Sequence, residues 1–154
     1  MENKEALKFN KIGTESMNKE NYEKALEYFL KSISIDPTNP VYYHNAGVCL
    51  MIEEENDRAI TLFKESLNKG IDIDETIYYL SNLLYDSKKF DELINLEINI
   101  KNSSYIYEIS IRKAKALITV GRLQESIKLL HQLRVNGFST QELDLIENMI
   151  KNNY

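Results

Sequence analysis

The sequence predicts an all-α fold, a solenoid of four helical hairpins followed by a C-terminal capping helix. Apolar residues recur at intervals of three and four along most of the chain, as they do on one face of a helix. A set of residues also returns after 34 positions, since Gly13, Ala25, Phe29 and Ser32 recur as Gly47, Ala59, Phe63 and Ser66. A fixed period of about 20 to 50 residues is the signature of a solenoid. Only two Pro and five Gly interrupt the 154 residues, which favours helix throughout.

The first hairpin covers about residues 6–39, with a polar turn at 18–21. Its second helix is expected to end before Pro37. Gly13 and Ala25 are small, so they should let the two helices approach closely.

The second hairpin covers about residues 40–73, with an acidic turn at 53–57. Pro40 is suited to the first turn of a helix, and Gly70 is suited to a C-terminal cap. Phe63, like the equivalent phenylalanine of the first hairpin, is expected to lie buried between neighbouring hairpins.

The third hairpin covers about residues 74–106 and follows the pattern less closely. Its second helix is expected to continue as far as Ile100. Glu97 stands where the first two hairpins have phenylalanine. Either this hairpin tilts differently, or its second helix shifts by one position to bury Leu96.

The fourth hairpin covers about residues 107–140. Ala114 follows Gly13 by 101 residues, one short of three periods. A one-residue deletion is therefore expected in the connection 101–106.

The last helix, about residues 141–151, has no second half. The residues Ser139 to Glu142 read as a capping box at its start. Because an end repeat leaves an apolar face unpaired, this helix is expected to cover the fourth hairpin. The whole chain, 1–154, is predicted to be one domain.

Charge and composition exclude several classes of partner. Nineteen Lys and Arg against 24 Asp and Glu give a net charge of −5, with both signs interspersed. Nucleic acid is therefore not expected as a partner, although Arg112, Lys113 and Lys115 could form a local basic patch. No apolar run approaches the roughly 18 residues of a membrane span, and no signal peptide is evident, so a cytoplasmic protein without a membrane partner is expected.

No motif for catalysis, cofactor binding or metal binding is expected. The single cysteine, Cys49, cannot form an internal disulfide and is expected to be a buried, inert thiol. Together with His44 and His131 it offers too few ligands for zinc. The acidic turn lacks the alternating oxygens and central glycine of a calcium loop. Neither GxSxG nor GxxxxGK occurs, so we expect no enzyme.

The repeat unit resembles the tetratricopeptide repeat (TPR) family. Five residues of the first hairpin match the family consensus: Gly13, Tyr22, Ala25, Phe29 and Pro37. The resemblance covers roughly residues 6–140 and is strongest in the first two hairpins. It implies a right-handed superhelix in which the first helix of each hairpin lines a concave groove. It also implies an interaction adaptor or scaffold that binds a peptide segment or helix of another protein there.

The family's groove positions carry over to four sets of residues. They are Asn10, Lys11, Thr14 and Met17; Val41, His44, Asn45, Val48 and Met51; Glu75, Tyr78, Tyr79, Asn82 and Tyr85; and Glu108, Ile111, Arg112 and Lys115. The predicted peptide-binding residues among them are Asn45, Val48, Met51, Tyr78, Tyr79, Asn82, Tyr85 and Arg112.

The chemistry of these residues suits a peptide, because asparagine offers a donor and an acceptor and tyrosine combines an apolar ring with a polar tip. Two alternatives stay open. The asparagines are solvated and bind nothing, or one of the consecutive tyrosines packs in the core while the other is exposed.

Some repeats of this family grip the C-terminal carboxylate of heat-shock proteins through Lys, Asn, Asn, Lys and Arg. The corresponding residues here are Asn10, Thr14, Asn45, Glu75 and Tyr79. Only Asn45 agrees, and an acid at Glu75 would repel a carboxylate, so that ligand is not expected. The alternatives to an adaptor are a small secretion-type chaperone that holds an extended client, and an RNA-binding helical array.

Overall fold

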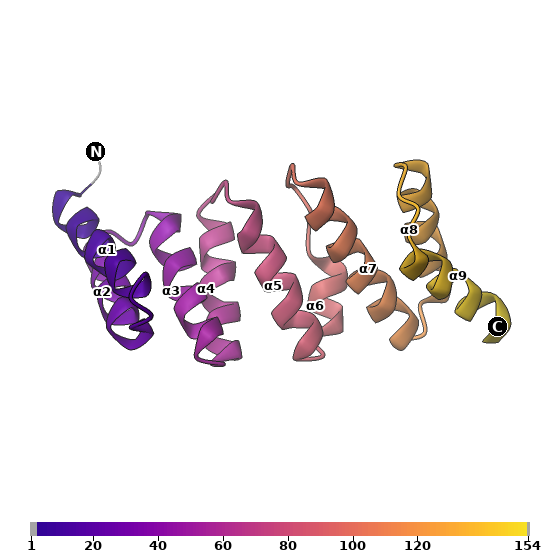
Figure 1. The fold of residues 1–154 in the computed structure, drawn as a ribbon, viewed down its shortest axis with the longest axis horizontal. Coiled ribbons are helices and arrows are strands. Elements are labelled where there is room, and N and C mark those ends of the chain that lie inside the picture. The colour runs from indigo at the N-terminus through magenta and orange to yellow at the C-terminus, as the bar shows by residue number, and fades with distance from the viewer. Residues whose placement is uncertain (1–2, 154) are drawn as a thin grey trace. The chain divides into compact units, whose positions relative to one another are not determined.

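The computed structural model describes residues 3–153, and within this range the chain forms nine α-helices and no strand (Figure 1). The helices are α1 (Lys4–Met17), α2 (Tyr22–Ile35), α3 (Pro40–Ile52), α4 (Asn56–Asn68), α5 (Asp74–Asp86), α6 (Phe90–Asn95), α7 (Ser103–Thr119), α8 (Leu123–Val135) and α9 (Gln141–Asn153). The predicted all-α repeat fold is confirmed. The chain divides into two compact units, of which the first ends at Leu83 and the second begins at Leu84, within α5.

In the first unit, the hairpins α1–α2 and α3–α4 close around glycine–phenylalanine contacts. A Cβ atom at Gly13 would lie 2.6 Å from the ring of Phe29, and one at Gly47 would lie 2.9 Å from the ring of Phe63. Real Cβ contacts are not this short, so only glycine lets the helices pack at this distance. The prediction that Gly13 lets the two helices of its hairpin approach closely is confirmed.

Two buried serines tie the second helix of each hairpin to the start of the first. The hydroxyl of Ser32 donates to the carbonyl of Ala6 at 3.0 Å, and that of Ser66 donates to the carbonyl of Pro40 at 2.8 Å. A satisfied hydroxyl can be buried without the penalty of an unpaired polar group. The two serines are one period apart, as are the contacts that they make.

The core between the first two hairpins surrounds Phe29, which is fully buried as predicted. It is formed with Ala25, Ala46 and Cys49. Burial raises the pKa of the Cys49 thiol to about 11, so the side chain is a protonated thiol at neutral pH, as expected for an inert core cysteine.

The turns inside the hairpins show where the repeat period changes. Glu20, Glu54 and Lys88 all have positive φ, at 57°, 61° and 56°, and they follow one another by 34 residues. The next such turn residue is Gly121, with φ of 78°, and it follows Lys88 by 33 residues. The one-residue deletion therefore lies between these two turns, a range that includes the predicted connection.

The second helix of the third hairpin is much shorter than predicted. α6 ends at Asn95, and Leu96 has extended backbone angles, with φ of −64° and ψ of 120°. The expectation of a helix to Ile100 is wrong, and so is the alternative of a shifted helix that buries Leu96. The third hairpin has Glu97 and Ile100 where the first two have phenylalanine and serine, so it lacks the two anchors that hold their second helices.

The last helix begins at a different cap from the predicted capping box. Thr140 supplies the capping oxygen, which accepts from the backbone N–H of Leu143 at 3.2 Å. Ser139 is therefore not the cap, and Glu142 is free to pair with the Lys115 ammonium at 2.6 Å instead. This pair ties α9 to α7.

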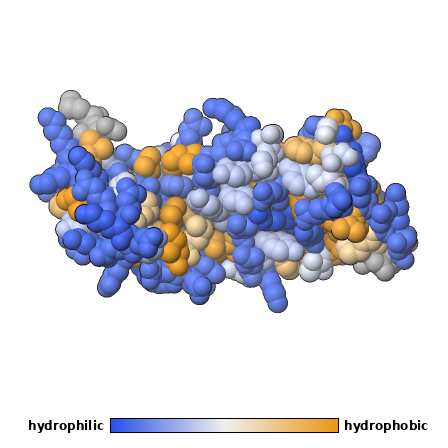
Figure 2. Space-filling model, in the orientation of Figure 1, coloured by the Kyte–Doolittle hydropathy of each residue, from blue (hydrophilic) through white to orange (hydrophobic). Residues whose placement is uncertain are grey.

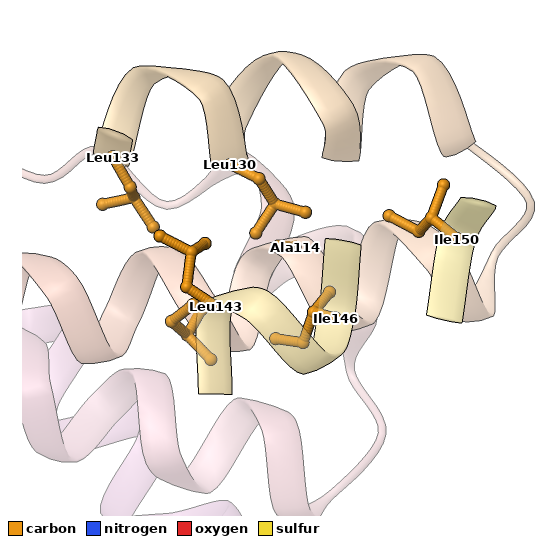
Figure 3. Close-up of a cluster of buried hydrophobic side chains, with 7 residues drawn as sticks. Ala114, Leu130, Leu133, Leu143, Ile146 and Ile150 are labelled. Atoms are coloured by element: carbon orange, nitrogen blue, oxygen red, sulfur yellow. The ribbon is translucent and has the colours of Figure 1, made fainter. Parts of the chain in front are cut away.

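The core of the second unit lies between α7, α8 and α9. In Figure 3, Leu143 and Ile146 of α9 point toward Leu130 and Leu133 of α8, above Ala114 of α7. All these side chains are buried. The prediction that α9 covers the fourth hairpin is confirmed.

Candidate functional site

In the first unit, side chains link the first helices of the three successive hairpins. The amide of Asn45 on α3 donates from Nδ2 to Oδ1 of Asn10 on α1 at 2.9 Å. Nδ1 of the adjacent His44 lies 2.8 Å from Oγ1 of Thr76 on α5. Neighbouring residues of α3 therefore reach the helices on its two sides.

These helices carry the residues of what we call the α1–α3–α5 face. It consists of Asn10, His44, Asn45, Val48, Met51, Tyr78, Tyr79 and Asn82, and all eight side chains are neither fully buried nor fully exposed. Six of the eight predicted binding residues are among them.

The face offers amide groups that the protein itself does not use. Within residues 3–153, Asn45 Oδ1, Asn10 Nδ2 and the whole Asn82 amide have no hydrogen-bond partner. An unused acceptor beside an unused donor matches the two polar groups of a peptide unit.

The two consecutive tyrosines both stay partly exposed, so the alternative in which one of them enters the core is wrong. Tyr79 stacks on His44 at 6.3 Å between ring centroids and contacts the ring of Phe63 at 6.0 Å. Tyr78 lies 5.8 Å from Tyr79. Tyr79 therefore has a fixed position on the face, set by the rings beneath it.

Like Asn10, His44 is a residue of the face that lies outside the predicted peptide-binding set. Its burial lowers the pKa of the imidazole, against a smaller opposing effect of the nearby Glu75 carboxylate. The ring is therefore neutral at neutral pH, packed against both Phe63 and Tyr79. The buried Thr76 lies within hydrogen-bonding distance of His44. The repeat could not predict this contact, because the two residues are 32 rather than 34 positions apart.

The other predicted residues belong to the second unit. Tyr85 contacts the ring of Phe90 at 5.9 Å, and Arg112 pairs with Glu108 at 3.0 Å. Their part in binding stays a prediction. Ile111, which the repeat pattern placed on the groove, is 3% exposed, because α9 packs its apolar side chains against it. That assignment is wrong.

Neither a metal-binding cluster nor a membrane-spanning helix occurs in the part of the chain that the structure describes. No group of three or more His, Cys, Asp or Glu residues there is arranged to hold a metal ion. None of the helices described is long and apolar enough to cross a membrane.

Comparison with known proteins bears on the first hairpin. A model of the tetratricopeptide repeat matches residues 9–39, which span most of α1, all of α2 and the turn to α3. The predicted resemblance to the tetratricopeptide repeat family is confirmed for this segment. The glycine–phenylalanine contact between α1 and α2 lies inside the matched segment.

Three known proteins are similar to this chain. Protein STIP1 homolog of Dictyostelium discoideum is 26% identical over 87 residues, which are 56% of this chain but only 15% of that protein. Among solved structures, the MamA RS-1 ArsTM double mutant has a TM-score of 0.76 at 16% identity, over 99% of this chain and 88% of its own. YrrB, described as a TPR protein with an unusual peptide-binding site, has a TM-score of 0.67 at 22% identity, over 84% of this chain and 68% of its own. At these identities the two structures show a shared fold.

Proposed function

We propose that this protein is a non-enzymatic interaction adaptor that binds an extended segment of another protein across the α1–α3–α5 face. The residues that support this are the unused amides of Asn10, Asn45 and Asn82, beside the half-buried Val48 and Met51. Amides that hold a peptide backbone, next to apolar side chains that hold its residues, are the usual means of peptide recognition. The peptide-binding site named for YrrB, which shares the fold, is consistent with such a role.

The observation that carries the proposal is the amide pair itself. A shift of 101 residues, which aligns Gly13 with Ala114, also aligns Asn10 with Ile111 and Asn45 with Ile146. Ile111 and Ile146 belong to one buried cluster that joins α7 to α9. The equivalent position between α1 and α3 is thus filled by two partly exposed amides where an apolar pair would stabilise the fold more. Polar groups kept at a position that packs well with isoleucine are best explained by a ligand.

The same residues indicate an internal segment rather than a chain end. The face lacks the lysines and arginine that would hold a terminal carboxylate, and Glu75 adds a negative charge beside it. Negative charge disfavours a carboxylate ligand. We therefore expect the bound segment to be uncharged at the point of contact and to use its main-chain groups.

The test is a binding measurement with partners captured from the source cell on the parent protein. In Asn45→Ala, which removes the central amide, affinity should fall by about 2 kcal/mol, roughly thirty-fold, as for a binding hot spot. Tyr79→Phe keeps the ring packing and removes only the hydroxyl. A loss of affinity in this variant would therefore come from a polar contact of the hydroxyl and not from the packing of the ring. Asn68→Ala, at an exposed asparagine on α4, is the matched control and should bind as the parent does.

Circular dichroism must show that each variant is folded. Partners that bind Asn45→Ala as tightly as the parent would show that another surface is used. Partners that bind a chain-end peptide in preference to an internal one would contradict the proposed ligand.

A further inference from the structure

A pocket opens on the second unit between α8 and α9. It has a volume of about 250 Å³ and is lined by Ile127, Leu130, His131, Glu147, Ile150 and Lys151. Its apolar wall comes from Ile127, which is 40% exposed, and from the buried Leu130 and Ile150. The three polar residues form its rim.

The repeat shows what fills the equivalent position in the first unit. The shift of 101 residues that aligns α8 with α2 and α9 with α3 places Ile127 on Leu26, Leu130 on Phe29 and Ile150 on Cys49. In the first unit, Phe29 and Cys49 are in one buried cluster, and both Leu26 and Leu62 pack against it. Leu62 belongs to α4, the second helix of the next hairpin. Within residues 3–153, no helix occupies the equivalent position beside α9.

We propose that this pocket is a docking site for an acidic amphipathic helix of another protein. The helix takes the position that α4 has in the first unit and inserts a leucine between Ile127 and Ile150. The site is separate from the α1–α3–α5 face, and it does not depend on the role proposed for that face.

The charge around the pocket determines whether the partner helix should be acidic or basic. Glu147 pairs with Arg134 at 3.0 Å, and Arg134 also pairs with Asp144. In the described part of the chain, the exposed Lys151 of the lining has no ion-pair partner, whereas Lys128, next to Ile127 in the sequence, interacts electrostatically with Glu125. The unused charge at the rim is therefore positive, so acidic residues on the docked helix would be attracted and basic ones repelled.

The residues of α9 that face this position explain why the bound helix comes from another molecule and binds reversibly. Glu147, Asn148 and Lys151 stand where the second hairpin has Ala46, Gly47 and Leu50. A close apolar contact like that of Gly47 with Phe63 cannot form against these polar side chains. A two-fold dimer through this surface would place equal positive charges opposite each other, which disfavours a second copy as the occupant.

The probe is a fluorescein-labelled peptide with the sequence of residues 55–69, which contains Leu62, in a version with Arg58→Glu and Lys64→Glu. Anisotropy titrations use the full chain. We expect the acidic peptide to bind at least tenfold more tightly than the unchanged peptide, and more weakly at higher salt. Leu62→Ala in the acidic peptide should weaken binding at least tenfold, because the pocket then loses its side chain.

On the protein, Ile127→Asp should weaken binding of the acidic peptide at least tenfold. The side chain is partly exposed, so this variant is expected to stay folded, as circular dichroism can verify. Val135→Asp, at a 66% exposed residue of α8 outside the pocket lining, is the matched control and should bind as the parent does. Lys128→Glu with Lys151→Glu should reverse the preference between the two peptides.

Absence of saturable binding by either peptide would overturn the proposal, as would equal binding to the Ile127→Asp protein. A parent protein that dimerises in sedimentation experiments, while Ile127→Asp stays monomeric, would show that a second copy is the occupant and that the partner helix is wrong. Asn45→Ala should leave binding of the acidic peptide to the pocket unchanged. This variant therefore distinguishes a wrong proposal for the pocket from a wrong proposal for the α1–α3–α5 face.

Discussion

Gly47 leaves no room for a side chain at its contact with Phe63, where an added Cβ would lie 2.9 Å from the ring. We predict that Gly47→Leu lowers the free energy of unfolding by roughly 1–3 kcal/mol, because inserting atoms into a packed contact forces the helices apart. Urea unfolding followed by circular dichroism measures this. Thr61→Leu, at an exposed residue of α4, controls for the added apolar surface. Equal stability of Gly47→Leu and the parent would contradict the packing described.

His44 should make stability depend on pH. An unfolded histidine titrates near pH 6.5, and burial lowers the pKa of His44 in the folded protein. On acidification the unfolded chain therefore takes up a proton first. The contribution of His44 to stability is complete above about pH 6.5 and is lost as the pH falls toward the lower native pKa.

Urea unfolding between about pH 7.5 and 5 checks this prediction, above the range in which carboxylates titrate. His44→Asn keeps a polar group near Thr76 and removes the titrating ring, so its stability should change less over this range. A parent protein whose stability rises on acidification would show that His44 is held in its charged form.

Single residues of the repeat and their burial could be predicted, and the polar contacts between hairpins could not. Gly13, Phe29 and Ser32 keep a fixed separation within a hairpin, so the period alone identifies them as recurring packing positions. The link from Asn10 to Asn45 spans 35 residues, and the link from His44 to Thr76 spans 32. These separations depend on how each first helix is rotated against the next, which a list of apolar positions does not determine.

At the scale of elements, α9 covers an apolar surface that the fourth hairpin cannot bury alone. We predict that deleting residues 139–154 makes the protein self-associate, because Leu130 and Leu133 become exposed. Light scattering after size exclusion measures the mass. A truncated protein that stays monomeric, with the melting temperature of the full chain, would show that α9 adds nothing to the fold.

The sequence contains a second pattern that predicts the early end of α6, but the helical periodicity of the same residues competes with it. The residues 96–100 alternate between apolar and polar, which is the pattern of an extended segment, and the exposed side chains are those of Glu97 and Asn99. Leu96 and Ile100 also fit a helical stripe, so the two patterns compete over so short a stretch. Lys113 then holds the extended form by donating from its ammonium to the carbonyl of Leu96.

At the scale of the whole molecule, each of the two compact units has its own buried cluster. In repeat proteins, stability is roughly a sum of local terms between neighbours. Phe63→Ala should therefore cost about 3–5 kcal/mol, as for large core deletions, and should act mainly on the first unit. Amide hydrogen exchange should become faster in α1–α4 and change little in α7–α9. An equal increase throughout would show that the chain unfolds in one step.

The extended segment after α6 also determines where the chain can be cut. The backbone groups of residues 97–100 form no hydrogen bond within the described chain, and Lys101 follows them directly. A protease needs an unpaired stretch of backbone that fits its active site. Brief trypsin treatment of the folded protein should therefore cleave after Lys101.

The fragment that contains α1–α5 would then carry the whole α1–α3–α5 face, and the fragment that contains α7–α9 would carry the whole pocket. Split at this point, or with a reporter inserted there, the protein would allow the two binding surfaces to be followed separately.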